Sequence, residues 1–285
     1  MLHDLRFRYW PLLKSWQTAL LVLTGLAGYL SAGAPAGGWG KLLGLAGSQF
    51  LAIGGGTALN MWFDRDLDAR MARTCRRPLP AGQVSGDQAL WFGVSLSTLG
   101  VGWAAALSPL YGALAVVGWL LEMGVYTLWL KRRTAWSVIW GGLSGSIPIL
   151  AGRALATGVV DQTGLLLALA VWLWIPTHNL TLTLLHFDDY QQAAVPTFVS
   201  ALGRGATRRL IAFSSGLAAV VMTATAVELG MPAARLWLLA GLSAGLLALA
   251  LGGWGRPSAR IVLVLYKYAS VYMLSCMVLM ALGTR

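Results

Sequence analysis

Nine long apolar segments dominate this chain of 285 residues and leave little sequence between them. Charged residues or clusters of Gly and Pro separate them, and they lie at about 16–31, 40–62, 89–107, 110–129, 138–154, 163–185, 209–228, 235–253 and 261–282. A helix needs about 20 apolar residues to cross the hydrocarbon core of a bilayer. We therefore expect an all-α integral membrane protein, a bundle of nine transmembrane helices.

The composition excludes the other fold classes. Hydrophobic residues make up 57% of the chain and charged residues 11%, whereas a soluble domain carries roughly 25% charged residues. The apolar segments are continuous, whereas the strands of an outer-membrane barrel alternate apolar and polar residues. Since nine spans leave only short loops, we expect residues 1–285 to form a single membrane-embedded domain.

The distribution of positive charge predicts the orientation in the membrane. If the N-terminus is cytoplasmic, sixteen of the 21 Lys and Arg residues fall in cytoplasmic segments, four fall on the opposite side, and Lys267 lies inside the last apolar segment. Short cytoplasmic loops carry an excess of Lys and Arg, so we expect the C-terminus outside the cell membrane. The same bias explains the net charge of +11, and we expect no nucleic-acid partner.

Acidic residues are rare, and five of the ten gather in two clusters. In the first cluster Asn60, Asp64 and Asp68 are spaced four residues apart, which places them on one face of a helix. Mg²⁺ binds carboxylates together with substrate phosphates, and the four arginines of segment 70–80 are suited to bind phosphate. The cluster predicts a metal–diphosphate site. The alternative is that these charges only set the orientation in the membrane and form internal salt bridges. It does not explain why Asn60, Asp64 and Asp68 share one helix face.

A second polar cluster lies within and directly after the sixth apolar segment. His178 lies in the cytoplasmic half of this segment, and Asp188 and Asp189 come at its end. The histidine can ligate a metal, contact a substrate or be a hydrogen-bonded core residue, and the residues alone leave these three roles open. The two aspartates are candidates for a second metal site.

Two more ionisable residues lie within apolar segments. Glu122 is in the middle of the fourth segment, one turn before Tyr126. A carboxyl at such a depth is a functional candidate, although a protonated, hydrogen-bonded carboxyl is the alternative. Lys267 either extends to the cytoplasmic edge of the membrane or reaches a diphosphate.

These motifs resemble a known family. The pattern Asn60-x-x-x-Asp64-x-x-x-Asp68, followed by the segment 76–82 (Arg-Arg-Pro-Leu-Pro-Ala-Gly), resembles the UbiA-type intramembrane prenyltransferases. The segments 64–71, 126–134 and 188–190, with His178 in place of a leading aspartate, are most similar to the protoheme IX farnesyltransferase (haem O synthase) branch. The similarity runs over about residues 10–280. Thr177 and the stretch 179–183 depart from the common bacterial pattern, and the resemblance places them near the acceptor pocket.

The resemblance implies Mg²⁺-dependent transfer of a farnesyl group from farnesyl diphosphate to a vinyl group of haem b, giving haem O. It implies catalytic roles for Asp64, Asp68 and Asp188, and it implies metal binding by Asn60, Asp64, Asp68, Asp188 and Asp189. The residues it implies for substrate binding are Asn60, Arg76, Arg77, Glu122, Tyr126, Lys131, His178 and Lys267.

The resemblance also implies membrane lipid around the protein and haem A synthase or terminal oxidase assembly as partners. Three alternatives remain open at this point. The nearest is transfer of a polyprenyl group to another lipophilic acceptor, either an aromatic quinone precursor or a glycerol phosphate lipid. A membrane transporter is the second, although transporters place polar groups near the bilayer midplane. The third is a non-catalytic haem-binding or assembly protein.

Overall fold

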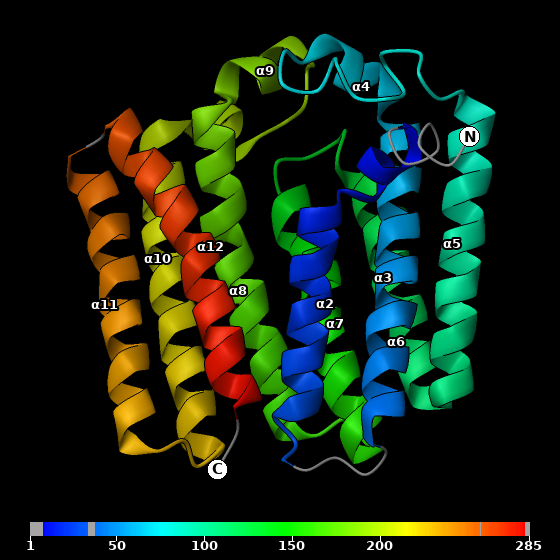
Figure 1. Cartoon of the computed structure of the whole chain (residues 1–285). Coiled ribbons are helices and arrows are strands. Elements are labelled where there is room, and N and C mark those ends of the chain that lie inside the picture. The colour runs from blue at the N-terminus through cyan, green and yellow to red at the C-terminus, as the bar shows by residue number, and fades with distance from the viewer. Residues whose placement is uncertain (1–7, 34–37, 257, 283–285) are drawn as a thin grey trace.

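The computed structural model describes residues 8–33, 38–256 and 258–282, and within these residues it consists of helices and connecting loops, without strands. The long helices run up and down between the two ends of the molecule (Figure 1). They are α2 (Ser15–Leu30), α3 (Gly38–Phe63), α5 (Gly86–Leu107), α6 (Pro109–Leu120), α7 (Ser137–Thr157), α8 (Gln162–Leu185), α10 (Phe198–Glu228), α11 (Ala233–Gly255) and α12 (Ala259–Ala281).

The all-helical membrane fold is confirmed. In the described part of the chain, eight helical segments are long and apolar enough to cross a bilayer, with α6 counted together with the π-helix η2 (Leu121–Leu130) that continues it. Helix α2 has 16 residues, which gives a length of about 24 Å, less than the roughly 30 Å of a hydrocarbon core. The ninth span therefore stays a prediction.

Most of the predicted apolar segments match helices to within a few residues, and α10 is the exception. We expected this helix to start near residue 209, whereas it begins at Phe198. Thr197 and Ser200 form a capping box that starts the helix there, and Gly203 interrupts it with φ 81° and ψ 166°. Because Ser200, Arg204 and Arg208 interrupt the apolar residues of this first part, the continuous apolar segment starts only after it.

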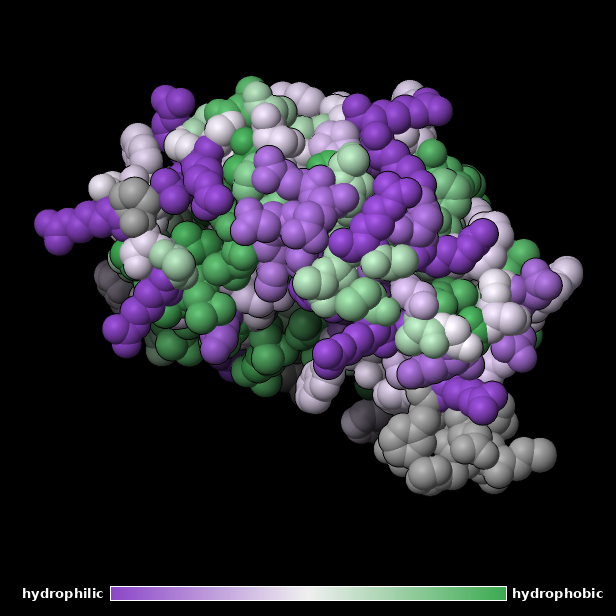
Figure 2. Space-filling view, turned by 90° about the horizontal axis from the view of Figure 1, so that it is seen from above, coloured by the Kyte–Doolittle hydropathy of each residue, from purple (hydrophilic) through white to green (hydrophobic). Residues whose placement is uncertain are grey.

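One end of the bundle collects the polar loops. The short helices α4 (Arg65–Arg70) and α9 (Phe187–Gln192) both lie across this end, which we call the polar end (Figure 1). Figure 2 views it from above and shows hydrophilic side chains over much of the face. The 3₁₀ turn η1 (Trp10–Leu13) precedes α2 here. The side of the membrane to which this end is exposed stays a prediction.

The long helices pack in a closed circuit. Each long helix contacts the next along the chain, and α12 contacts α2. In addition, α2 contacts α7 and α8 contacts α12. Helices α3 and α5 come closest at Gly100, where a Cβ atom would lie 2.7 Å from the Cα atom of Ala52. Small residues allow this backbone approach in membrane helices. Helix α3, which carries the first acidic cluster at its end, is therefore fixed against its neighbour.

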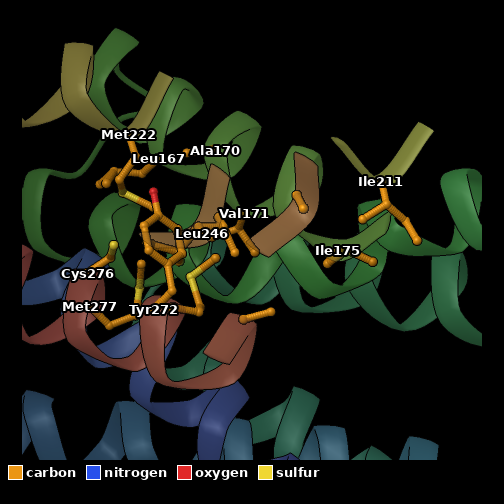
Figure 3. Packing of buried hydrophobic residues seen from close by; sticks show 14 of the residues in the cluster. Leu167, Ala170, Val171, Ile175, Ile211, Met222, Leu246, Tyr272, Cys276 and Met277 are labelled. Atoms are coloured by element: carbon orange, nitrogen blue, oxygen red, sulfur yellow. The ribbon is translucent and has the colours of Figure 1, made fainter. Parts of the chain in front are cut away.

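The largest apolar core fills the half of the molecule built from α8, α10, α11 and α12. Figure 3 shows part of it, with Leu167 and Val171 of α8, Met222 of α10, Leu246 of α11 and Tyr272 of α12. These side chains are at most 2% exposed. Tight packing of this kind gives the polar end a rigid base.

Candidate functional site

The first acidic cluster lies where α3 passes into α4. The backbone N–H of Asp64 donates to Asn60 O at 2.9 Å, and that of Asp68 donates to Asp64 O at 2.8 Å. The four-residue spacing therefore holds across the boundary between the helices, as predicted. Asn60, Asp64 and Asp68 are 6%, 2% and 4% exposed. Two carboxylates buried at the end of an apolar helix need positive partners.

Two cations from different elements supply this charge. Lys131, the residue after η2, donates its Nζ to Asp64 Oδ2. Arg77, from the loop after α4, donates Nη1 to both carboxylate oxygens of Asp68 at 2.9 and 2.8 Å. The structure thus brings together Asp64, Asp68, Arg77 and Lys131, four of the residues predicted from sequence.

Positive charge accumulates around these carboxylates. Burial alone would lower the pKa of Lys131, but the neighbouring Tyr126 ring and the Asp64 carboxylate raise it above the usual range of lysine. Burial and the charges of Arg77 and Lys131 lower the pKa of Lys14 to about 8. Lys14 has the left-handed backbone conformation φ 42°, ψ 56° at the start of α2. Such a conformation is uncommon for a non-glycine residue.

A third ion pair closes the outer edge of the cluster. Arg132 donates Nη1 and Nη2 to Asp66 at 2.8 and 2.7 Å, and Nη2 also donates to Phe63 O at 2.9 Å. The hydrogen bonds from Arg132 lower the pKa of the Asp66 carboxyl below its ordinary value. Nη2 of Arg132 lies 3.8 Å from Asp64 Oδ1, so Arg132 contributes to the positive potential at Asp64.

One carboxylate oxygen of the cluster accepts no hydrogen bond from the described residues. This oxygen, Asp64 Oδ1, is buried and has only the ion-pair contact with Arg132 at 3.8 Å, which is costly for an ionised group. Among the described residues, no three His, Cys, Asp or Glu side chains are close enough to hold a metal ion by themselves. Mg²⁺ commonly uses only one or two carboxylates and completes its shell with water and substrate phosphates. The orphaned oxygen and the oxygen-only donor set fit such an ion.

The second acidic cluster adjoins the first at the polar end. Asp189 Oδ1 accepts from the backbone N–H of Ala72 at 3.3 Å, so α9 contacts the loop after α4. Leu67 and Met71 pack against Ala193 and Val195 beneath this contact. Asp188 is exposed. The two predicted acidic clusters therefore lie at the same end of the bundle, and their contact is between Asp189 and the loop after α4.

The π-helix η2 carries the predicted residues Glu122 and Tyr126. Its backbone keeps a five-residue hydrogen-bond step, with Lys131 N donating to Tyr126 O at 2.9 Å. Glu122 Oε2 accepts from Ser144 Oγ at 2.7 Å, and the Tyr126 ring centroid lies 5.5 Å from Lys131 Nζ. Among the described residues, no hydrogen bond or ion pair joins Glu122 to the carboxylate cluster. Short π segments occur often at functional sites.

His178 lies apart from the carboxylates, between α8 and α12. Its ring stacks on Trp174 and Tyr266, with centroid distances of 5.2 and 4.7 Å, and its Nδ1 lies 3.4 Å from Ser270 Oγ. Arg76 and Lys267 are exposed. In the part of the chain that the structure describes, no hydrogen bond or ion pair connects either of them to the acidic clusters.

Three residues near the cluster did not stand out in the sequence. Lys14 and Arg132 belong to groups of basic residues that also serve orientation, and only Lys131 was selected from its group. Thr127 is 0% exposed and accepts a hydrogen bond from Asn60 Nδ2 at 3.0 Å. Its position directly after Tyr126 was the available signal, but a single threonine in an apolar helix is ordinary.

Comparison with known proteins gives a consistent result. The sequence pattern of the UbiA prenyltransferase family matches residues 21–271. A protoheme IX farnesyltransferase of Rhodopseudomonas palustris is 35% identical over 289 residues, which cover 93% of this chain and 86% of the relative. One from Pyrobaculum neutrophilum is 40% identical over 199 residues, covering 69% and 71%.

Solved structures share the fold. A structure of digeranylgeranylglyceryl phosphate synthase has a TM-score of 0.81 at 17% identity and covers 99% of each chain. A UbiA homologue of Archaeoglobus fulgidus bound to GPP and Mg²⁺ has a TM-score of 0.70 at 15% identity, covering 96% of this chain and 99% of its own. At these low sequence identities, the structural similarity shows that the chains share an arrangement of helices.

Proposed function

The chain belongs to the UbiA prenyltransferase family, and we propose that it transfers a farnesyl group from farnesyl diphosphate to a vinyl group of haem b, giving haem O. The proposal rests mainly on the relatives named protoheme IX farnesyltransferase, because their similarity spans most of the chain at 35–41% identity. The family match identifies an enzyme, so the transporter and the non-catalytic haem-binding protein are set aside.

The polar end supports a role in binding a diphosphate. Asn60, Asp64 and Asp68, with Asp188 and Asp189 from the second cluster, would hold Mg²⁺, and the bound ion would supply positive charge that stabilises the leaving diphosphate. The buried Asp64 Oδ1 without a hydrogen-bond partner supports this assignment. The oxygen-only ligands of these five residues also suit a hard cation.

The cations of the site act on the leaving group. When the C–O bond of farnesyl diphosphate breaks, negative charge develops on the diphosphate, and preorganised cations stabilise it. Lys131 and Arg77 are held beside the carboxylates by ion pairs, and Lys14 lies within their electrostatic range. Arg76 is exposed and would add charge at the rim. The raised pKa of Lys131 keeps this residue charged at neutral pH.

The allylic cation left by this cleavage needs protection from water until the acceptor attacks. The vinyl group of haem b forms the new C–C bond, and a water molecule then adds and loses a proton to give the hydroxyethylfarnesyl group. Tyr126 lies next to Lys131 and offers an aromatic face to a cation. Glu122, on the same π-helix, and Lys267 are the remaining substrate-binding candidates.

His178 is our candidate contact for the haem. Trp174 and Tyr266 cover the two faces of its ring, which leaves the ring edge as its point of contact. If Nδ1–H donates to Ser270 Oγ, the lone pair of Nε2 is available to iron. The exposed Trp and Leu side chains around the bundle are suited to lipid, and we expect the enzyme in the cell membrane with its polar end toward the cytoplasm.

The test is an incubation of purified protein with haem b, farnesyl diphosphate and Mg²⁺, with the products analysed by liquid chromatography and mass spectrometry. A haem that gains one farnesyl group and one hydroxyl group is the expected product. Unchanged haem, combined with prenylation of an aromatic acceptor or a glycerol phosphate lipid, would retain the family chemistry and overturn the acceptor. Geranylgeranyl diphosphate as an alternative donor tests the chain length.

A further inference from the structure

We propose that Thr127 is a positioning residue that fixes the amide of Asn60, so that Asn60 presents its Oδ1 oxygen to the metal–diphosphate complex. The proposal rests on the proposed function, because Asn60 is one of the metal ligands assigned there. It concerns a residue that carries no ligand atom for the metal itself and acts through Asn60.

The hydrogen bonds around Thr127 determine which way the Asn60 amide points. Thr127 Oγ1 donates to Glu122 O at 2.8 Å, and a hydroxyl has one proton to donate. Its oxygen can therefore only accept from Asn60, and Asn60 Nδ2 lies at 3.0 Å. The NH₂ group must face Thr127, and Oδ1, the one atom of this side chain that binds Mg²⁺, faces away from it.

The π-helix makes this arrangement available. In an α-helix a threonine hydroxyl usually bonds the carbonyl three or four residues earlier, whereas Thr127 bonds the carbonyl of Glu122, five residues earlier. In the wider turn of η2 the hydroxyl proton of Thr127 is therefore used in a hydrogen bond to the carbonyl of Glu122, within the same helix. Lys131, the residue directly after η2, bonds Asp64. The π-helix and the residue that follows it therefore contact two of the three predicted ligands on the α3–α4 face.

Burial makes the interaction strong enough to matter. Thr127 is 0% exposed and Asn60 is 6% exposed, so water does not compete well for the amide. Removal of a residue that orients a metal ligand through a hydrogen bond typically changes metal affinity about 10–100-fold. A role in packing alone would depend on the shape of Thr127 and would not require its hydroxyl.

Three variants separate these roles. Thr127→Val keeps the shape and removes the hydroxyl, whereas Thr127→Ser keeps the hydroxyl and removes a methyl group. Thr225→Val is the matched control, because Thr225 is also 0% exposed and its Oγ1 donates to a backbone carbonyl, Val221 O, at 2.7 Å. Thr225 lies in α10, and its contacts are distant from the carboxylate cluster.

The measurement is Mn²⁺ binding by electron paramagnetic resonance, with inorganic diphosphate present, on full-length protein in nanodiscs. We expect Thr127→Val to weaken Mn²⁺ binding about 10–100-fold, and Thr127→Ser and Thr225→Val to stay within about threefold of wild type. Melting temperatures of all three variants are measured in parallel. The Mn²⁺ readout is independent of turnover.

Three results would overturn the proposal. Wild-type Mn²⁺ affinity in Thr127→Val would show that the hydroxyl does not position Asn60. Equal losses in Thr127→Ser, which keeps the hydroxyl, and in Thr127→Val would show that any change at this buried position disturbs the site through packing and that the hydroxyl has no separate role. Wild-type protein that binds Mn²⁺ and diphosphate but leaves haem unchanged would overturn the acceptor and leave the role of Thr127 intact. Wild-type protein that binds no Mn²⁺ would overturn both.

Discussion

Replacement of Asp64 by Asn removes one negative charge from the polar end with almost no change in shape. Asp64 is 2% exposed, and its partner Lys131 has a side-chain exposure of 19%. Removing one member of a buried ion pair costs about 3–5 kcal/mol, because the other charge is left uncompensated. The partial exposure of Lys131 places the expected loss of stability near the lower value, about 3 kcal/mol.

The expected loss of activity has a separate origin. If Asp64 binds the metal, its replacement removes stabilisation of the charge that develops on the leaving diphosphate. The loss of one such interaction typically lowers kcat by about 10²–10³, equivalent to roughly 2.7–4 kcal/mol. We therefore expect Asp64→Asn to lose at least about 100-fold in haem farnesylation, measured by mass spectrometry on purified protein.

A second variant separates stability from activity. In Asp64→Asn/Lys131→Met both charges are absent, so the melting temperature should return close to that of wild type, monitored by the fluorescence of the 14 tryptophans. Activity should remain at the level of Asp64→Asn or below it. Near-native turnover in the single variant would refute the metal assignment. Activity in the double variant above that of the single variant would show that Asp64 serves only to neutralise Lys131.

Three further variants probe other parts of the chain. His178→Ala should reduce haem affinity and abolish any histidine signature in the haem absorption spectrum, while Mn²⁺ binding with diphosphate stays unchanged; an unchanged spectrum would remove His178 from the acceptor site. Lys131→Met frees the Asp64 carboxylate, so it should raise the affinity for Mn²⁺ without diphosphate and lower the affinity for diphosphate. If both affinities rise or both fall, Lys131 and the metal do not compete for Asp64. At the opposite end, Asp161→Asn keeps the N-cap but removes the charge that pairs with Arg153 at 2.8 Å, so loss of the charged hydrogen bonds should lower the stability by about 2 kcal/mol at pH 7. Burial alone would raise the pKa of Asp161, but the hydrogen bonds from Arg153 and the Gly164 N–H lower it below 3.8. The stabilisation is therefore present above pH 3.8 and is lost as the pH falls further, and a pH-independent difference in melting temperature would refute the ion-pair explanation.

Hydropathy and charge predicted most of the helical framework. A membrane span must satisfy its backbone internally, so a long apolar segment has few alternatives to a helix, and α3, α8 and α12 match their predicted segments closely. The start of α10 was missed because a capping box and a glycine kink, rather than hydropathy, define it. The division of the fourth segment into α6 and the π-helix η2 was also missed. A change in helical hydrogen-bond step leaves no mark in apolar periodicity.

The candidate site was predicted less completely. The four-residue spacing of Asn60, Asp64 and Asp68 predicted that they share a face, since this depends only on local helix geometry. The contact between Asp189 and the loop after α4 depends on the packing of distant segments, and the sequence indicated only that both lie at the same end. The partners of His178 on α12 could not be predicted, because no local pattern links α8 to Tyr266.

The ion pairs at the polar end also bear on how the site would bind its substrates. The oxygens of Asp64 and Asp68 that accept hydrogen bonds from Lys131 and Arg77 are the atoms that a metal ion would use. Metal and cations therefore compete for the same carboxylates. A diphosphate resolves this competition, because it offers oxygens to the metal and to the cations together. Since Lys131 directly follows η2 and Arg77 lies in the loop after α4, binding of the metal–diphosphate complex would couple both segments to α3. On this basis the carboxylates and the basic residues act as one charge-balanced unit, and altering either set should change the affinity for both the metal and the diphosphate.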